Sequence, residues 1–545
     1  MSSQDASKTQ IVVLGGGFAG VYAAMHLEKR MTAAERQTTE LSIVSNENYI
    51  VFQPLLPEVI SGTLETLHCI TPIRRLTRRA KLYTRTIEDI DFQRKTVRLA
   101  PEYLPRPIDL AFDHLIICLG SRLDYDRVPG MREHAIPFKY LGDALRLRDA
   151  AVGALEEANI ETDAIEKKKL LTFVVAGGGF SGVECMAELH DFLSRAIREF
   201  NNLRRDELRC VLVQSAGRIL PELSESLASY AHRILHRRGV EILLETRLKA
   251  ISSHGALLQD KATGACRILN ARTVVSTIPT AAHELISRLP CELANGRIVV
   301  DAHLNVPGCT HIWAVGDCAA VPQRDGLTSP PTAQHALRQA KICGENVVAA
   351  LRGQPLKKFN FTGLGKLASL GKHAAVADIM GIKLHGFVAW LFWRSIYLAK
   401  IPGLDRKIRV ATDWTLDLVL PRDITQVRIF RPHDVTSEHF HAGEAIFEEG
   451  DFGNKLYIVV RGEVEIVKND AVIAVAGENE VFGEIALVSE QSRTATVRAK
   501  TDVDVISLAR PAFQNLFAHL PGVRASVGAI LKSHGGAFPE QADEH

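Results

Sequence analysis

Short apolar runs that end in glycines are the clearest pattern along this chain. The run Ile11–Leu14 leads into Gly15-Gly16-Gly17-Phe18-Ala19-Gly20, and Leu171–Val175 precedes Gly177-Gly178-Gly179-Phe180-Ser181-Gly182. Each run has the length and composition of a buried strand, and each glycine segment opens into an apolar stretch typical of a helix. The pattern therefore predicts two strand–turn–helix units, one near the start of the chain and one much further on.

The spacing of the glycines indicates what these turns bind. In G-x-G-x-x-G the glycines allow a tight turn, let the backbone approach a pyrophosphate and pack helix against strand. The phosphates then meet the free N–H groups at the helix N-terminus. Two such turns predict two dinucleotides on one chain, which favours electron transfer between a flavin (FAD) and a nicotinamide. The glycines expected at these contacts are Gly15, Gly17, Gly20, Gly177, Gly179 and Gly182.

Further strands complete the first unit. A second strand, Leu41–Val44, ends at Ser45, with Glu47 two residues later, where an acidic residue normally binds ribose hydroxyls. Glu47 either makes that contact or faces solvent, and the sequence leaves both readings open. We also expect strands at His114–Gly120 and Thr310–Ala319. The second contains Gly316 and Asp317, whose carboxylate is suited to accept a hydrogen bond from a flavin ribityl hydroxyl.

The second unit has no acid at the matching position. Its strand Cys210–Val213 is followed by Gln214, with Arg218 nearby. An acid there would repel the 2′-phosphate of NADPH, whereas Gln214 does not and Arg218 can pair with that phosphate. We therefore expect NADPH to be accepted beside NADH.

The aromatic stretch at residues 386–398 comes nearest to a membrane span, but it is too short and is interrupted by Arg394. Fewer than about 18 consecutive apolar residues do not cross a bilayer. Together with a second stretch, residues 414–420, it predicts an amphipathic segment that lies on a membrane surface. The alternative is a helix buried between domains. The expected anchors are Phe387, Trp390, Leu391, Phe392, Trp393, Tyr397, Leu398 and Trp414, with Lys383, Arg394, Lys400, Arg406 and Lys407 as cations.

Beyond about residue 436, short apolar runs alternate with glycines, a pattern typical of a β-barrel or jelly roll. The segments Phe482–Leu487 and Arg493–Thr496 resemble the phosphate-binding cassette of cyclic nucleotide-binding domains. By that resemblance a short helix near Gly483 and the Arg493 guanidinium bind the cyclic phosphate of cAMP or cGMP. Glu484 accepts from the ribose hydroxyl, and Thr494 suits cGMP without excluding cAMP. The alternative is a barrel that has lost its ligand.

Composition narrows the classes further. The 545 residues carry a formal net charge of only +2, so charge gives no indication of nucleic-acid binding. Nine cysteines include no CxxC and no metal-ligand cluster, which favours a reducing compartment and no metal site. The first ten residues lack the pattern of a signal peptide. We therefore expect a cytoplasmic location. A helix at Pro511–Leu520 is expected to close the barrel and leaves no room for a helix-turn-helix domain.

Residues 9–430 resemble the type II NAD(P)H:quinone oxidoreductases, the non-pumping single-subunit respiratory dehydrogenases. The likeness rests on both glycine segments, Phe52–Val59, the Gly316-Asp317 turn and Pro331–Gln339. It implies an enzyme that reduces a membrane quinone, a peripheral (monotopic) position on the cytoplasmic face of the membrane and a homodimer. The site residues that the resemblance implies are Ala333 beside the flavin and Glu184, Gln334 and Gln339 as catalytic groups.

The expected fold is α/β, with two Rossmann-like dinucleotide-binding domains of the disulfide-reductase flavoprotein type and a C-terminal jelly roll. Two other functions stay open: reduction of a soluble redox partner, and redox or cyclic-nucleotide sensing with little turnover. The expected domains are 9–125 plus 295–350 for FAD, 126–294 for NAD(P)H, 351–430 for membrane anchoring and 436–530 for cyclic nucleotide.

Overall fold

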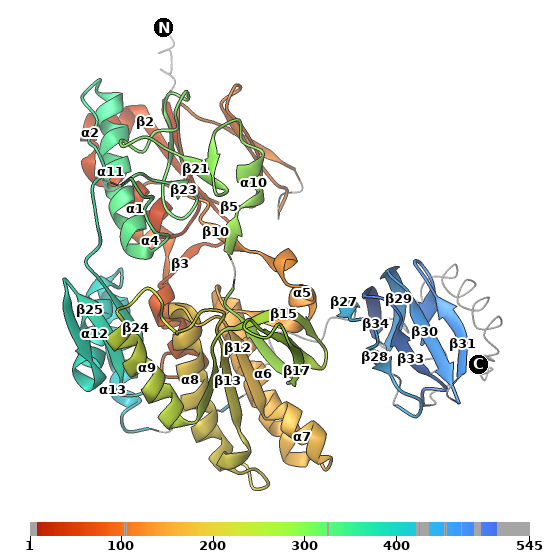
Figure 1. Cartoon of the computed structure of the whole chain (residues 1–545). Helices are drawn as coiled ribbons and strands as arrows, with labels where there is room; N and C mark the ends of the chain where they lie inside the picture. Colours follow the sequence, from red (N-terminus) through yellow and green to blue (C-terminus); the bar gives the residue numbers. More distant parts are fainter. Residues whose placement is uncertain are drawn as a thin grey trace, which may run out of the picture.

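Two parallel sheets, which share the order of four of their five strands, form the frame of the molecule in a computed structural model (Figure 1). The structure describes residues 8–102, 104, 106–278, 280–323, 326–420, 424–425, 435–451, 453, 455–469, 471–483 and 492–509. The first sheet has the order β22-β9-β1-β2-β5, and all of its pairs are parallel. Its strands are β1 (Thr9–Leu14), β2 (Thr39–Ser45), β5 (Lys81–Thr84), β9 (His114–Ile117) and β22 (Ile312–Ala314).

The second sheet has the order β11-β18-β12-β13-β14, which repeats the first except at one edge, where β11 precedes the other strands in the chain and β22 follows them. In both sheets the strand before the glycine turn lies in the centre. The strands of the second sheet are β11 (Ala135–Pro137), β12 (Thr172–Ala176), β13 (Arg209–Val213), β14 (Val240–Leu243) and β18 (Thr273–Ser276).

The predicted strands occur, but two of them end earlier than expected. β9 ends at Ile117, three residues before Gly120, and β22 ends at Ala314, two residues before Gly316. Gly120 has φ +66° and Gly316 has φ +81°, a left-handed conformation that ends a strand and that glycine adopts without strain. The chain therefore turns out of the sheet at these glycines.

Helices cover the sheets and carry the two glycine turns into the fold. α1 (Phe18–Arg30) follows β1 and packs against α11 (Ala333–Leu351), so segments more than 300 residues apart lie side by side (Figure 1). α8 (Phe180–Ala196) follows β12 in the same way. The remaining helices of the second half include α5 (Met131–His134), α6 (Leu141–Ile160), α7 (Ala164–Leu170) and α9 (Glu225–Arg238).

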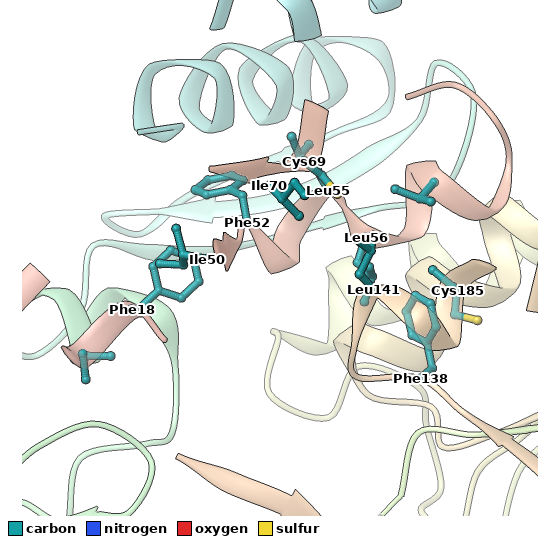
Figure 2. Close-up of a cluster of buried hydrophobic side chains, with 14 of the residues drawn as sticks. Phe18, Ile50, Phe52, Leu55, Leu56, Cys69, Ile70, Phe138, Leu141 and Cys185 are labelled. Atoms are coloured by element: carbon teal, nitrogen blue, oxygen red, sulfur yellow. The ribbon is translucent and has the colours of Figure 1, made fainter. Parts of the chain in front are cut away.

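A continuous apolar seam joins the two halves. Figure 2 shows Phe18 and Ile50 on one side, Phe52 and Leu56 between, and Leu141, Phe138 and Cys185 on the other. α3 (Leu56–Ile60) contacts both α6 and α8, and its residues Leu56 to Ile60 are all buried. The seam therefore sets the position of one half relative to the other.

Smaller antiparallel sheets flank this frame, and one of them supports a pair of helices. β25 contacts α12 (Gly386–Lys400), which packs on α13 (Leu404–Leu416). No helix within the described part of the chain is long and apolar enough to span a bilayer. The sheets are β6 (Ile87–Asp91), β7 (Thr96–Leu99) and β8 (Ile108–Ala111); β15 (Thr246–Ser252), β16 (Gly255–Asp260) and β17 (Cys266–Asn270); and β24 (Gly365–Ser369), β25 (Ala375–Ile379) and β26 (Ile382–His385).

The C-terminal region forms two antiparallel sheets, β27-β34-β29-β32 and β28-β33-β30-β31, as expected for a jelly roll. It lies beside α5, on the far side of the molecule from α12 and α13 (Figure 1). The helix expected at Pro511–Leu520 and the short helix after Gly483 lie outside the described residues. Its strands are β27 (Val435–Phe440), β28 (Ala445–Phe447), β29 (Lys455–Arg461), β30 (Val464–Lys468), β31 (Ala471–Ala476), β32 (Val481–Phe482), β33 (Thr496–Ala499) and β34 (Val503–Ala509).

Candidate functional site

A cavity of about 550 Å³ opens above the carboxyl ends of the first sheet. Ligands bind at this edge in open α/β sheets, where the strand order reverses. The cavity brings together residues from five separate segments of the chain. They are Gly15, Gly17, Ser45, Glu47, Lys139, Gly316, Asp317 and Ala333, of which all but Lys139 are predicted from the sequence.

The first glycine turn is shaped so that side chains do not fit. A Cβ on Gly15 would lie 2.2 Å from the Cys118 carbonyl oxygen, and one on Gly20 would lie 1.9 Å from the Gly15 carbonyl oxygen. At Gly17 a Cβ would meet nothing within 4 Å, and its φ of −82° is open to any residue. Gly15 and Gly20 are therefore needed for the turn itself, whereas Gly17 borders open space at the helix N-terminus.

Asp317 lies at the edge of this cavity beside an unexpected lysine. Lys139 donates from Nζ to the Ser121 hydroxyl at 2.8 Å, and its burial lowers its pKa to about 8. Burial raises the pKa of Asp317, while the nearby positive charges of Lys139 and Arg297 oppose that rise. The backbone N–H of Gly316 donates to Gln339 Oε1 at 2.8 Å. Gln339, only 2% exposed, thus holds the turn that carries Asp317.

At the end of β2, Ser45 and Glu47 behave differently. Ser45 is buried, and its hydroxyl accepts from the Glu47 backbone N–H at 3.3 Å. A Cβ on Gly16 would lie 2.2 Å from that hydroxyl, so Ser45 fills the space beneath the turn. Glu47 is exposed but also lines the cavity, so both of its interpretations stay open.

The second glycine turn repeats the first. A Cβ on Gly177 would lie 2.3 Å from the Thr277 hydroxyl, and one on Gly182 would lie 1.7 Å from the Gly177 carbonyl oxygen. Gly179 again borders more open space, since a Cβ there would approach only Glu222 Oε1, at 3.6 Å.

Gln214 lies directly under this turn. Its Oε1 accepts from the Gly178 backbone N–H at 3.1 Å, and its Nε2 donates to the Arg218 carbonyl at 3.3 Å. Arg218 is exposed and its guanidinium donates to the Pro221 carbonyl at 3.0 Å. The neutral amide therefore bridges the glycine turn and the loop that carries Arg218.

Glu184, on α8 just after the second turn, is buried between the two halves. Its Oε1 accepts from the Ser369 backbone N–H at 2.9 Å, at the end of β24. Burial penalises its carboxylate and raises its pKa to about 8. Glu184 therefore keeps its proton at neutral pH, as a proton donor in a dry site must.

The N-terminal turn of α11 carries the remaining predicted residues. Gln334 accepts from the Leu364 backbone N–H at 3.1 Å and donates to the Gly365 carbonyl at 3.3 Å. The Arg338 guanidinium lies 4.1 Å from the centroid of the Phe361 ring and donates to the Gln334 carbonyl at 3.1 Å. Gln334 thus ties α11 to β24, the strand that also holds Glu184.

The prediction of tryptophan membrane anchors is wrong. Trp390, Trp393 and Trp414 are 9%, 1% and 6% exposed, because these faces of α12 and α13 pack into the core. Arg394 is not a lipid-facing cation either. Its guanidinium lies 4.2 Å from the Trp390 ring and 4.6 Å from the Trp414 ring, and it pairs with Glu58 at 3.5 Å. Trp414 Nε1 also donates to Glu58 at 2.6 Å.

The opposite faces of the two helices expose apolar side chains. Phe387 and Leu391 are 58% and 52% exposed and are separated by one helical turn on α12. Leu404 and Ile408 repeat this spacing on α13. α12 therefore combines the two alternatives that the sequence left open, because one of its faces is buried and the other is exposed.

In the barrel, Arg493 is held in place from several sides. Its guanidinium donates to the carbonyls of Gly483 at 2.6 Å and Lys455 at 2.7 Å and lies 4.0 Å from the Phe447 ring centroid. Arg493 is 5% exposed, whereas the adjacent Thr494 is exposed. Glu484 lies outside the described residues.

Sequence reasoning missed Lys139, Ser369 and the pair of Glu58 with Arg394. Lys139 and Ser369 follow no motif, and only the fold brings them to their partners. Arg394 does interrupt an apolar run, and Glu58 stands alone in another; each is a sign of a buried charge that needs a partner.

Comparison with known proteins agrees with this geometry. Residues 9–340 match the family "Pyridine nucleotide-disulphide oxidoreductase", residues 364–423 match "NDH2 C-terminal domain" and residues 437–519 match "Cyclic nucleotide-binding domain". The chain is 28% identical over 434 residues to the type II NADH:quinone oxidoreductase Ndh of Mycobacterium tuberculosis, covering 77% of this chain and 90% of that protein. It is 29% identical to the demethylphylloquinone reductase NdbB of Synechocystis, covering 75% and 96%.

The fold is also shared with solved structures. NDH2 from Plasmodium falciparum superposes with a TM-score of 0.71 at 20% identity, covering 77% of this chain and all of that one. The glycine turns, the sheet order and these matches together assign the chain to the pyridine nucleotide-disulphide oxidoreductases, among the type II NADH:quinone oxidoreductases, with an added cyclic nucleotide-binding domain.

Proposed function

We propose that this protein oxidises NADH or NADPH and reduces a membrane quinone, with FAD as the intermediate carrier. The observation that carries this proposal is the pair of glycine turns, each built so that a Cβ would clash at the first and last glycines of its G-x-G-x-x-G segment. They lie on two sheets that share the order of four strands and are joined by one apolar seam.

The residues of the first half fit FAD. The turn at Gly15 leaves the N-terminus of α1 open to a pyrophosphate, and Gly17 borders open space there. Asp317, held by the Gln339–Gly316 hydrogen bond, is suited to accept from a ribityl hydroxyl. When bound, FAD supplies two-electron transfer from nicotinamide to quinone. Gln339 acts in this proposal as a positioning residue for Asp317.

The second half fits a nicotinamide dinucleotide of either kind. Gln214 offers an uncharged amide where the ribose binds, and Arg218 is exposed beside it. Neither residue repels a 2′-phosphate, and an arginine can pair with one through two N–H groups. We therefore propose that NADH and NADPH are both substrates.

Quinone reduction takes up two protons and two electrons, and a transferred hydride delivers both electrons but only one proton. Glu184 is suited to hold the second proton because its pKa lies near 8 and Ser369 fixes its position. We propose that Glu184 carries this proton and that Gln334 ties α11 to β24 beside it.

A lipid quinone is reached from the membrane, and the exposed apolar faces of α12 and α13 fit that surface. Leu391→Glu and Phe387→Glu should abolish flotation with anionic liposomes and leave turnover of a water-soluble quinone unchanged. Ile160→Glu changes an equally apolar side chain, 73% exposed on α6, and serves as the matched control. Full flotation of the double α12 variant contradicts the membrane assignment.

The main test is the absorption spectrum and steady-state turnover of the purified chain. We expect a bound flavin and quinone-dependent oxidation of NADH at more than about 1 s⁻¹, the range of ordinary enzymes. A turnover below about 0.1 s⁻¹ with every quinone supports the sensor alternative. Faster reduction of a ferredoxin-like acceptor than of quinones supports the soluble-partner alternative.

We propose further that the barrel binds cAMP or cGMP. The Arg493 guanidinium, fixed by two carbonyls and the Phe447 ring, offers a planar set of donors for a cyclic phosphate. Calorimetry should detect binding of one of the two nucleotides, and Arg493→Lys should weaken it at least about tenfold (~1.4 kcal/mol) because lysine lacks the bidentate fork. Equal binding by both proteins contradicts the proposal.

A further inference from the structure

Histidines gather where the barrel meets the second half of the enzyme. His134 of α5 lies with Nε2 2.9 Å from the backbone carbonyl of His439 on β27. His254, in the turn between β15 and β16, has Nε2 3.6 Å from Glu444 of the barrel. Figure 1 shows β27 as the strand of the barrel nearest to α5.

Three barrel residues at this contact form a compact set of metal-ligand atoms. His439, His441 and Asp502 each offer one such atom, and these atoms lie within 4.8 Å of one another. The strand pairing explains the cluster, because β27 and β34 are antiparallel with His439 opposite Asp504. His441 and Asp502 lie two residues further along and therefore stand next to each other, with His441 Nδ1 3.8 Å from the Asp502 carboxylate.

The hydrogen bonds of His439 prepare it to be a ligand. Its Nδ1 is 2.5 Å from the Asp504 carboxylate, which favours the tautomer with the proton on Nδ1 and the lone pair on Nε2. A carboxylate on the other ring nitrogen is the usual support of a metal-bound imidazole. His439 is only 4% exposed, so this orientation is fixed by the core of the barrel.

Buried atoms in the cluster also lack partners. Among the described residues, no hydrogen-bond partner is found for Nε2 of His439 or Nε2 of His441. A buried polar atom without a partner is unfavourable, and a metal ion would supply the missing partner. Glu444 belongs to the same group because its Oε2 accepts from the His441 backbone N–H at 2.9 Å.

We propose that His439, His441 and Asp502 bind a divalent transition-metal ion of the zinc class. Zinc-class ions bind imidazoles well, whereas calcium and magnesium prefer oxygen ligands, so two imidazoles and one carboxylate favour the zinc class. Three protein ligands leave a further position for water or Glu444. The sequence did not predict this site, since His441 and Asp502 are brought together only by the pairing of β27 with β34. A metal ion here would fasten the edge of the barrel that contacts α5.

The test uses the full-length protein after treatment with a chelator. Calorimetry with Zn²⁺ and absorption spectra with Co²⁺ should give about one ion per chain, with the ligand-field bands of bound cobalt. His441→Gln and Asp502→Asn should each weaken binding at least tenfold. Asp502→Asn keeps an oxygen that can accept from the Ala442 N–H, now at 3.0 Å, so the turn is preserved.

Two matched controls keep the result specific. His303→Gln changes a histidine that lies 3.4 Å from Asp301, outside the cluster, and should bind like the unaltered chain. His236→Gln removes one of the stacked pair His232 and His236 on α9, a second place where two histidines lie close together. Binding that persists in both cluster variants, or that is lost in His236→Gln instead, overturns the proposal. So does the absence of any Zn²⁺ or Co²⁺ binding.

Discussion

The two nucleotide-binding halves use nearly the same backbone and differ in what surrounds it. Gly15 and Gly177 have φ +115° and +112°, and each donates its N–H to the end of the next strand, at 2.8 and 2.9 Å. Gly17 and Gly179 begin their helices with φ −82° and −77° and ψ −170° in both. The two turns therefore have the same backbone conformation.

The differences lie at the strand ends and beyond the helices. Under the first turn a serine hydroxyl accepts from Glu47, whereas under the second the amide of Gln214 accepts from the turn itself. The first half adds Asp317 at the cavity, and the second adds the buried carboxyl of Glu184. The backbone of the two turns is therefore shared, and under the proposed function the groups around each turn distinguish a flavin site from a nicotinamide site.

The largest effects are expected from substitutions in the two glycine turns, which should impair the binding of different cofactors. Gly17→Ala places a methyl group in space that no protein atom occupies, so the fold is kept but a dinucleotide is obstructed. We expect flavin affinity to fall at least about tenfold (~1.4 kcal/mol), and activity to be lost with the flavin. Gly179→Ala should instead raise KM for NADH by a similar factor with flavin retained. The measurements are the flavin-to-protein ratio and steady-state kinetics.

Gly477→Ala is the control for this pair, because a Cβ there also meets nothing within 4 Å and the residue lies in the barrel. Flavin loss in Gly179→Ala but not in Gly17→Ala reverses the assignment of the two halves. Full flavin content and normal KM in both variants reject both sites.

The next largest effect is expected at Glu184, the buried carboxyl group of the second half. Glu184→Gln keeps a neutral side chain but cannot release a proton, so kcat should fall about 10²-fold, the size of a general-acid contribution. In the parent enzyme kcat should decline as pH rises through about 8, since Glu184 then ionises. The variant should lose this decline. A pH–rate profile from pH 6 to 9 with the same limb in both enzymes rules out Glu184 as its source.

The same carboxyl affects stability with a defined sign. Its pKa is raised on folding from 4.5 to about 8, so the folded state holds a proton that the unfolded state releases between these values. The stabilisation is complete below pH 4.5 and is lost as pH rises through 8. Glu184→Gln should flatten this part of the curve of melting temperature against pH, and an unchanged slope contradicts the raised pKa.

The smallest effect is expected at Gln214, the residue under the second glycine turn, and concerns the preference between NADH and NADPH. Gln214→Glu keeps an oxygen that can accept from Gly178 but adds a charge beside the ribose. NADPH should lose about tenfold (~1.4 kcal/mol) in kcat/KM relative to NADH, since the carboxylate repels a 2′-phosphate. NADH kinetics of the same variant give the internal control. An unchanged ratio of kcat/KM for NADPH to that for NADH would show that the ribose 2′-position does not lie near Gln214.

Sequence reasoning was most successful where local chemistry leaves few choices. The fold class, the family and the two glycine turns followed from apolar runs that end in G-x-G-x-x-G, because only glycine fits at positions such as Gly20 and Gly182. Reasoning failed at α12, where tryptophans were assigned to the membrane. An apolar helix shows that some face is buried but not which one, and Trp393 is 1% exposed.

The strand–turn–helix units, the added barrel and the candidate residues Asp317 and Gln214 are readable from the residues alone, and Glu184 from the family resemblance. The contacts of Lys139 with Asp317, of Arg394 with Glu58 and of His441 with Asp502 follow from the packing of the fold. The residues that specify a turn or a helix lie within a few positions of one another, so their effect depends little on the rest of the fold. Partnerships between distant side chains depend on how sheets and helices pack, and a buried charge or imidazole acquires its chemistry only from the neighbours that packing supplies.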